Sequence, residues 1–171
     1  MAGDALGFEV RSLSAADTES LGEALGRALT RSVVIALDGD LGAGKTCFVR
    51  GLARGLGVSD AISSPTYALL QTYTGRLTLH HLDAWMEGRE RAFLVDGGLE
   101  WVASAGVTVI EWAERVADLL PTPRISVQIE RTSPDERLIR IAPVGDEASA
   151  SGVAVPGSVS AVVEALRAPA R

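Results

Sequence analysis

One segment of the chain restricts its fold more than any other: Gly39-Asp40-Leu41-Gly42-Ala43-Gly44-Lys45-Thr46 matches the phosphate-loop pattern G-x-x-x-x-G-K-[ST] in full. Such a loop works between a buried strand and a helix, because its backbone N–H groups and the positive end of the helix dipole face the same anion. Val33 to Leu37 is a short apolar run typical of a buried strand, and Lys45 to Leu56 is apolar at helical spacing before Gly57. This context favours a phosphate loop over the alternative, an ordinary glycine turn before a helix.

The loop predicts a nucleotide and a metal ion as ligands. We expect Lys45 to reach the β- and γ-phosphates and the Thr46 hydroxyl to bind Mg²⁺, so the predicted cofactors are ATP and Mg²⁺. Lys45 is the only lysine among 16 basic residues. A codon bias toward arginine explains the other basic positions, whereas a compact ammonium is what fits inside a tight phosphate loop. The residues expected to contact the nucleotide are Asp40, Leu41, Gly42, Ala43, Gly44, Lys45, Thr46 and Cys47.

Two carboxylates end predicted strands and are candidates for the metal and the chemistry. Asp83 continues the face of Leu79 and His81 at a strand end, where α/β proteins bind ligands, so it is a candidate Mg²⁺ ligand, directly or through water. The alternative is a turn-forming Asp with His81 as a half-buried filler. Glu111 ends the apolar run from Val107, as the acid of a Walker B element does, and is a candidate to bind the metal or to orient the attacking water. The alternative is an acid that favours the dipole of the next helix.

Three further residues have both a functional and a structural interpretation. Thr66, in Ser64-Pro65-Thr66, lies where P-loop switches place a threonine that senses the γ-phosphate, although these residues also suit an ordinary turn. Trp112 either packs against the nucleotide or fills the core. Cys47 lies in a first helical turn, where the dipole lowers a thiol pKa, although a lone cysteine also serves as a small inert hydrophobe.

The rest of the chain predicts one α/β domain over residues 1–142 and a tail over residues 143–171. Ser14 with Asp17 predicts the start of a first helix that runs to Thr30, and helices are also expected over Glu87–Val95 and Trp112–Leu120. Two hairpins are expected, one around a two-residue turn at Thr74-Gly75 and one joining Arg124–Arg131 to Arg137–Ile141. The tail consists of a low-complexity linker over Pro143–Gly157 and an isolated helix over Ser158–Arg167.

Composition excludes several classes of protein. The formal net charge of -6 argues against direct attraction of nucleic acid, so any tRNA is expected to be held by a partner. A single cysteine and the lack of a signal peptide or long apolar run predict a cytoplasmic protein without a membrane association. A GTPase of the Ras type is not expected, because its guanine-specificity motif requires a second lysine.

Four segments together resemble one family. The phosphate loop, Ser64-Pro65-Thr66, His81-Leu82-Asp83 and Val109-Ile110-Glu111-Trp112 are similar to the motifs of the TsaE (YjeE) family, over most of Ser12 to Ile141. These proteins are bacterial ATPases required for threonylcarbamoyladenosine modification of tRNA.

The resemblance implies a P-loop NTPase-like fold with a mixed central sheet and flanking helices, slow ATP hydrolysis that partners stimulate, and action with TsaD and TsaB. It implies catalytic roles for Lys45, Thr66 and Glu111, metal binding by Thr46, Asp83 and Glu111, and nucleotide contact by Trp112. Two departures stand out: Cys47 occupies the position of a usual second threonine, and Ala84-Trp85-Met86 replaces a segment that often carries Leu-Tyr-Arg.

Three functions are therefore open at the level of sequence. The favoured one is a Mg-dependent ATPase that acts on the TsaD/TsaB complex. The alternatives are a small-molecule P-loop kinase, which would need an arginine-bearing lid, and a nucleotide-gated binding module without significant turnover.

Overall fold

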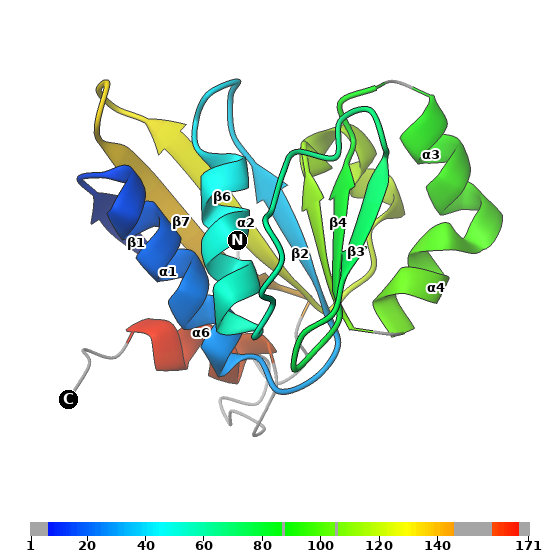
Figure 1. Ribbon diagram of the computed structural model, residues 1–171, viewed down its shortest axis with the longest axis horizontal. Helices are drawn as coiled ribbons and strands as arrows, with labels where there is room; N and C mark the ends of the chain where they lie inside the picture. The colour runs from blue at the N-terminus through cyan, green and yellow to red at the C-terminus, as the bar shows by residue number, and fades with distance from the viewer. Residues whose placement is uncertain (1–6, 87, 105, 146–158, 168–171) are drawn as a thin grey trace.

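A mixed β-sheet forms the centre of the protein (Figure 1). The computed structural model describes residues 7–86, 88–104, 106–145 and 159–167. Within these residues the sheet has seven strands in the order β1-β7-β6-β2-β5-β4-β3. The strands are β1 (Phe8–Ser12), β2 (Val33–Asp38), β3 (Leu70–Tyr73), β4 (Leu79–Asp83), β5 (Val107–Glu111), β6 (Arg124–Arg131) and β7 (Arg137–Val144).

The four central strands run parallel and the outer ones antiparallel. β2 pairs in parallel with both β5 and β6, and β4 pairs in parallel with β5. β1, β7 and β3 complete the sheet through antiparallel pairs. The carboxyl ends of β2, β4 and β5 therefore meet at one edge of the sheet, where the predicted site residues follow them.

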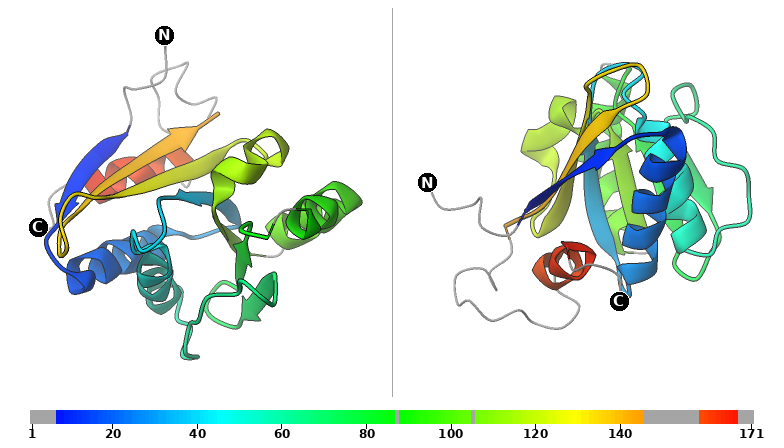
Figure 2. Two further views of the ribbon diagram at one scale, coloured as in Figure 1. Left: turned by 90° about the horizontal axis from the view of Figure 1, so that it is seen from above. Right: turned by 90° about the vertical axis from the view of Figure 1, so that its left-hand side faces the viewer.

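Helices cover both faces of the sheet (Figure 2). On one face lie α1 (Ala15–Ala28), α2 (Lys45–Gly55) and α6 (Val159–Arg167). The other face carries α3 (Arg89–Phe93), the π-helix η1 (Leu94–Gly98), α4 (Leu99–Ser104) and the 3₁₀ helix η2 (Ala113–Leu119). β2 serves both layers, since Ile35 and Leu37 pack toward α1 and α2 while Val34 and Ala36 pack toward the other group. Burial on both faces explains why this strand reads as a continuous apolar run.

Glycines allow α1 and α2 to pack very closely. Gly22 and Gly26 of α1 face Gly51 and Gly55 of α2, and each pair is spaced four residues apart, so both lie on one helix face. A Cβ added at Gly51 would lie 1.9 Å from the carbonyl oxygen of Glu19. No side chain fits between the two backbones at this point, so the glycines fix the position of α2 and of the loop that precedes it.

The structure contains most of the strands and helices predicted from the sequence. Ser14 is the N-cap of α1, and its side chain accepts a hydrogen bond from the backbone of Asp17, as the capping pattern predicts. β2, α2 and the β6–β7 hairpin lie where they were expected. β1 was not predicted; it forms because it pairs with β7 at the edge of the sheet.

The predicted two-residue turn at Thr74-Gly75 is wrong. The connection between β3 and β4 spans residues 74–78, and its Arg76 side chain reaches the backbone carbonyls of Gly26 and Leu29 at 2.8 Å each. These tertiary contacts hold the loop against the helix ends, and a tight hairpin would not reach them.

Two helix predictions need correction. The helix expected over Glu87–Val95 continues through η1 into α4, with a kink at Gly97, whose φ is +90°. α6 is not isolated, because Val162 and Val163 are buried in the core that α1, α2 and the sheet share. Apolar residues on one face of a short helix are better buried than exposed, which explains the docking. The predicted linker begins within β7, and residues 146–157 lie outside the described part of the chain.

Candidate active site

A cleft of about 580 Å³ lies at the carboxyl ends of β2, β4 and β5. Most of the predicted site residues line it: Leu41, Gly42, Gly44, Lys45, Thr46, Cys47, Thr66, Asp83, Glu111 and Trp112. Arg50, Ser64 and Trp85 contribute to the same walls. The parallel order of the central strands thus brings together residues that are more than 70 positions apart in the chain. Of the predicted loop residues, Asp40 and Ala43 do not line the cleft.

The phosphate-loop segment forms a glycine-rich turn that leads into α2. Gly42 and Gly44 have φ angles of +76° and +110°, which favour glycine. Gly44 is the N-cap of α2 and provides no side-chain cap. The positive end of the helix dipole therefore opens toward the cleft without a protein side chain of its own to cap it.

Lys45 is held at the floor of this loop. Its side-chain ammonium donates to the carbonyl oxygens of Gly39 and Asp40, the latter at 3.0 Å, and it lies 3.6 Å from the centroid of the Trp112 ring. The residue is 5% exposed. Burial lowers the pKa of Lys45, and the charges of Glu111 and Glu114 oppose that shift. The lysine is thus a buried cation whose neighbours are carbonyls, an aromatic ring and acids.

Glu111 connects two strands and the first turn of α2. Its Oε1 accepts a hydrogen bond from Thr46 Oγ1 at 3.0 Å and lies 2.8 Å from His81 Nε2. The side chain turns toward α2, so the alternative that Glu111 serves the dipole of the next helix does not describe its contacts. His81 is fully buried and bonded to an acid, which a half-buried filler would not be.

Asp83 links the end of β4 to the segment that contains Thr66. Its Oδ2 accepts hydrogen bonds from Thr66 Oγ1 at 2.7 Å and from Ser64 Oγ at 3.4 Å. Its Oδ1 accepts from the backbone of Trp85 at 2.8 Å, which is the turn-forming contact of the structural interpretation. Asp83 therefore makes the turn with one oxygen and holds the Ser64–Thr66 segment beside the cleft with the other.

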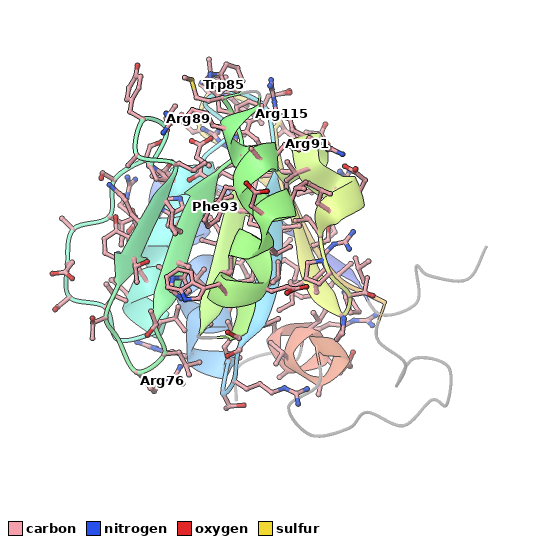
Figure 3. The ribbon with its side chains drawn as sticks, turned by 90° about the vertical axis from the view of Figure 1, so that its right-hand side faces the viewer. Arg76, Trp85, Arg89, Arg91, Phe93 and Arg115 are labelled. Carbon is pink, nitrogen blue, oxygen red and sulfur yellow. The ribbon has the colours of Figure 1, made fainter. Side chains whose placement is uncertain are left out.

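Trp112 lines the cleft and also packs, partly buried, against the core on the face of the sheet that carries α3 and α4. It adopts the left-handed conformation, with φ of 59°, directly after β5. Its ring packs against Trp85 with centroids 4.5 Å apart, and the guanidinium carbon of Arg115 lies 4.6 Å from the Trp85 ring centroid. Figure 3 shows Trp85 and Arg115 close together at this end of the molecule. The ring also lies beside Lys45, with its centroid 3.6 Å from the ammonium.

Two acids lie behind the loop. Asp38, the last residue of β2, accepts a hydrogen bond from the backbone of Glu114 at 2.8 Å. Burial and the neighbouring Asp38 raise the pKa of Glu114 to about 7. Near neutral pH the negative charge beside Lys45 therefore varies with the protonation of Glu114.

Arg137 supports the loop from β7 and was not predicted from the sequence. Its Nε donates to the Ala43 carbonyl at 2.7 Å, and its Nη1 donates to the carbonyls of Ser133, Pro134 and Glu136. No motif marks this arginine, because the contact joins segments 94 residues apart. His81 belongs to the family-like segment His81-Leu82-Asp83, but its contact with Glu111, 30 residues away, was not predicted.

Of the two interpretations of Cys47, a thiol with a lowered pKa does not fit its surroundings. Burial raises the pKa of the thiol, and the charge of Glu19 raises it further. The sulfur donates to the Ala15 carbonyl at 3.3 Å, so Cys47 joins α2 to α1 as well as lining the cleft.

Among the described residues no group of three or more His, Cys, Asp or Glu side chains could hold a metal ion by itself. Within the same residues no helix has both the length and the apolar character that crossing a membrane requires.

The sheet order, the glycine loop and its following helix define the class of the protein: an α/β fold of the P-loop type. A solved structure of this fold supports the assignment. The chain is similar to YdiB from Bacillus subtilis, with a TM-score of 0.72 and 29% sequence identity over 94% of each chain.

The particular family follows from the sequence comparisons. Residues 12–139 match the model of the family described as threonylcarbamoyl adenosine biosynthesis protein TsaE. A TsaE protein of tRNA threonylcarbamoyladenosine biosynthesis from Treponema pallidum is 45% identical over 77% of this chain and 97% of its own length. The corresponding protein of Bacillus subtilis is 39% identical over 66% of this chain and 71% of its own length. The chain belongs to the TsaE family, and its role lies in the biosynthesis of threonylcarbamoyladenosine in tRNA.

Proposed function

We propose that this protein binds ATP with Mg²⁺ in the cleft and hydrolyses it in the service of the TsaD/TsaB complex. The observation that carries the proposal is the hydrogen bond between Thr46 and Glu111, which joins the first turn of α2 to the end of β5 at the mouth of the loop. A hydroxyl and a carboxylate in this relation are what a P-loop hydrolase needs beside the terminal phosphate.

The loop suits a polyphosphate. Gly42 and Gly44 leave its inner side free of side chains, α2 begins there without a side-chain cap, and Lys45 supplies a buried positive charge. Backbone N–H groups and a partly desolvated ammonium favour a phosphate over a neutral ligand. The tryptophan pair of Trp85 and Trp112 adds an apolar wall to the same cleft.

The oxygen donors around the cleft suit Mg²⁺. Thr46, Asp83 and Glu111 present one hydroxyl and two carboxylates, and hard oxygen ligands are those that Mg²⁺ prefers. When bound, the ion would neutralise charge on the phosphates as the terminal phosphoryl group is transferred. Thr46 would hold it, Glu111 would meet it through water, and Asp83 would meet it directly or through water while retaining the Ser64–Thr66 segment.

The chemistry of hydrolysis requires a group that orients water. In the proposed reaction the water oxygen forms a bond to the γ-phosphorus, the bond between that phosphorus and the ADP oxygen breaks, and the proton of water passes to the Glu111 carboxylate and on to phosphate. Lys45 stabilises the negative charge that develops on the phosphate oxygens. Thr66, held by Asp83, would sense whether the γ-phosphate is present.

The partners follow from the family. TsaE relatives act in tRNA threonylcarbamoyladenosine biosynthesis, so we propose TsaD and TsaB as the proteins that stimulate hydrolysis. The net charge of -6 favours contact with tRNA only through that complex.

Single-turnover hydrolysis, measured with and without TsaD and TsaB, tests the function. We expect partner-stimulated release of phosphate. A kinase would instead consume ATP only with a small acceptor, and a binding module would bind ATP without turnover in either condition. Either of those results would contradict the proposal.

The variant Glu111→Gln sharpens this test. It keeps the size of the side chain and removes the carboxylate, so Mg·ATP should still bind while hydrolysis falls about 100-fold. Asp83→Asn is the matched comparison, and it should shift the Mg²⁺ dependence of nucleotide affinity before it affects the rate. Normal hydrolysis by the Glu111→Gln protein would remove Glu111 from the chemistry.

A further inference from the structure

His81 is a buried histidine with one ring nitrogen engaged and the other unpartnered. Nε2 lies 2.8 Å from Glu111 Oε1, and Nδ1 has no hydrogen-bond partner among the described residues. The side chain is fully buried, so water does not reach the ring from the surface. A buried polar ring has a cost in free energy, and here a single contact offsets it.

That contact falls on the oxygen that Thr46 already uses. Among the described residues, both hydrogen bonds of the Glu111 side chain end on Oε1, one from Thr46 and one shared with His81. Because Oε1 accepts from the Thr46 hydroxyl, His81 Nε2 faces it as a donor. With Oε1 held from two sides, the carboxylate plane is fixed and Oε2 is left for the cleft that Glu111 lines.

The register of the sheet makes this arrangement possible. His81 pairs with Val109 in β5, two residues before Glu111, so a long ring on β4 reaches the carboxylate at the end of the neighbouring strand. Asp83 leaves β4 on the same face as His81 and engages Thr66. One face of β4 therefore carries Asp83 itself and the histidine that contacts Glu111.

We propose that His81 is a positioning residue: its Nε2–H holds Glu111 Oε1 and so aims Oε2 at the water that attacks the γ-phosphate. This inference rests on the proposed ATP hydrolysis. His81 does not line the cleft, so it would act on a bound nucleotide only through Glu111. The alternative is a core histidine whose contact with the acid has no effect on turnover.

His80 provides a matched control within the chain. It is the adjacent residue of β4, is 2% exposed, and its ring nitrogen Nε2 likewise has no hydrogen-bond partner in the part of the chain that the structure describes. Its ring points to the opposite face, where Nδ1 contacts Thr72 at 3.0 Å and the ring packs against Trp101. A change at His80 disturbs a buried histidine of the same strand without touching Glu111.

The first experiment does not depend on hydrolysis. The chain has two histidines, so ¹⁵N labelling of histidine gives two sets of ring signals, which a His80 variant assigns. In the full-length protein without nucleotide, we expect His81 Nε2 to carry a proton. A His81 ring with an unprotonated Nε2 would overturn the proposal, because that nitrogen could not donate to Glu111.

The second experiment compares His81→Met with His81→Gln. The two side chains are similar in length, but only glutamine retains an N–H donor. With TsaD and TsaB present, His81→Met should hydrolyse bound Mg·ATP about tenfold more slowly or worse, at unchanged nucleotide affinity, whereas His81→Gln should recover most of the rate. His80→Met should hydrolyse ATP at the rate of the unmodified protein.

The outcomes separate the two proposals. Equal rates in His81→Met and His81→Gln, whether normal or reduced, would overturn the positioning role. Absence of hydrolysis by the unmodified protein with its partners would refute the proposed function instead, and the protonation of Nε2 would still decide whether His81 holds Glu111.

Discussion

The free backbone groups at the two ends of α2 differ in whether the protein itself supplies hydrogen-bond partners for them. At the N-terminus, Gly44 supplies no side-chain cap, and the first turn opens into the cleft. At the C-terminus, the Arg76 side chain donates to the carbonyl of Gly55 and its backbone N–H to that of Leu56, and the same guanidinium donates to Gly26 and Leu29 at the end of α1. Figure 3 shows Arg76 at the end of the molecule opposite Trp85 and Arg115.

This difference gives the two ends of one helix different roles: the C-terminal end contributes to stability, and the N-terminal end is available for a ligand. Helix ends normally satisfy their free backbone groups, and one guanidinium does so here for α1 and α2 together. The other end leaves its donors for a ligand, and the close glycine contact between α1 and α2 keeps that end in place. Changes at the two ends should therefore affect different properties: affinity at the N-terminus and stability at the C-terminus.

The largest effect is expected at the open end. Lys45→Ala removes the buried ammonium, so ATP affinity should fall roughly 10- to 100-fold, as expected for loss of a charged hydrogen bond. The fold should remain, because the hydrogen bonds that the Lys45 ammonium makes to described residues go to Gly39 and Asp40 of the loop, and its ring contact is with Trp112. Calorimetric titration with Mg·ATP measures this. Lys45→Arg keeps the charge but should not restore ATP affinity, since a planar guanidinium does not fit the loop. An unchanged ATP affinity in folded Lys45→Ala would contradict the role of Lys45 in phosphate binding.

The capped end should show the opposite result. Arg76→Ala leaves the carbonyls of two helix ends without their donor, and we expect a loss of about 1–2 kcal/mol in the free energy of unfolding, because water replaces part of the contact at this exposed side chain. ATP affinity should not change. Arg27→Ala is the control. Its exposed ion pair with Glu23 lies on α1, one of the two helices whose ends Arg76 caps, and should contribute less than about 0.5 kcal/mol. Urea denaturation of both variants decides, and equal stability of the two would show that the Arg76 cap is unimportant.

The comparison also shows what a sequence can predict. The loop end is local: Gly39 to Thr46 is contiguous, and its chemistry depends on glycine, lysine and threonine at fixed spacing, so the pattern alone indicates it. Asp83 and Glu111 were found for a related reason, because each ends an apolar strand and parallel strands end at one edge.

The capped end is not local. Arg76 reaches carbonyls 47 and 50 residues earlier in the chain, and nothing in a segment read as a two-residue turn points to them. The contacts of His81 and Arg137 were not predicted for the same reason, since each residue acts through a partner on another strand or loop. The docking of α6 and the pairing of β1 likewise depend on surfaces that exist only after the sheet has formed.

The smallest expected effect concerns a structural contact at the functional end. A peptide group is planar and trans, so when Arg137 holds the Ala43 carbonyl, the N–H of Gly44 points in the opposite direction, toward the inside of the loop. Arg137→Met should leave this peptide free to rotate and weaken ATP affinity roughly three- to tenfold, the range expected for one hydrogen bond. Titration calorimetry at moderate salt measures the change, and the control is Arg140→Met on the same strand, whose partners Glu9 and Glu130 lie away from the loop. Arg137→Lys distinguishes geometry from charge, because lysine keeps the positive charge and lacks the guanidinium fork that reaches Ala43 and the β6–β7 turn at once. If Arg137→Lys binds ATP as well as the unmodified protein, the arginine acts by its charge alone; if it binds as weakly as Arg137→Met, the arginine acts by fixing the peptide that the nucleotide meets.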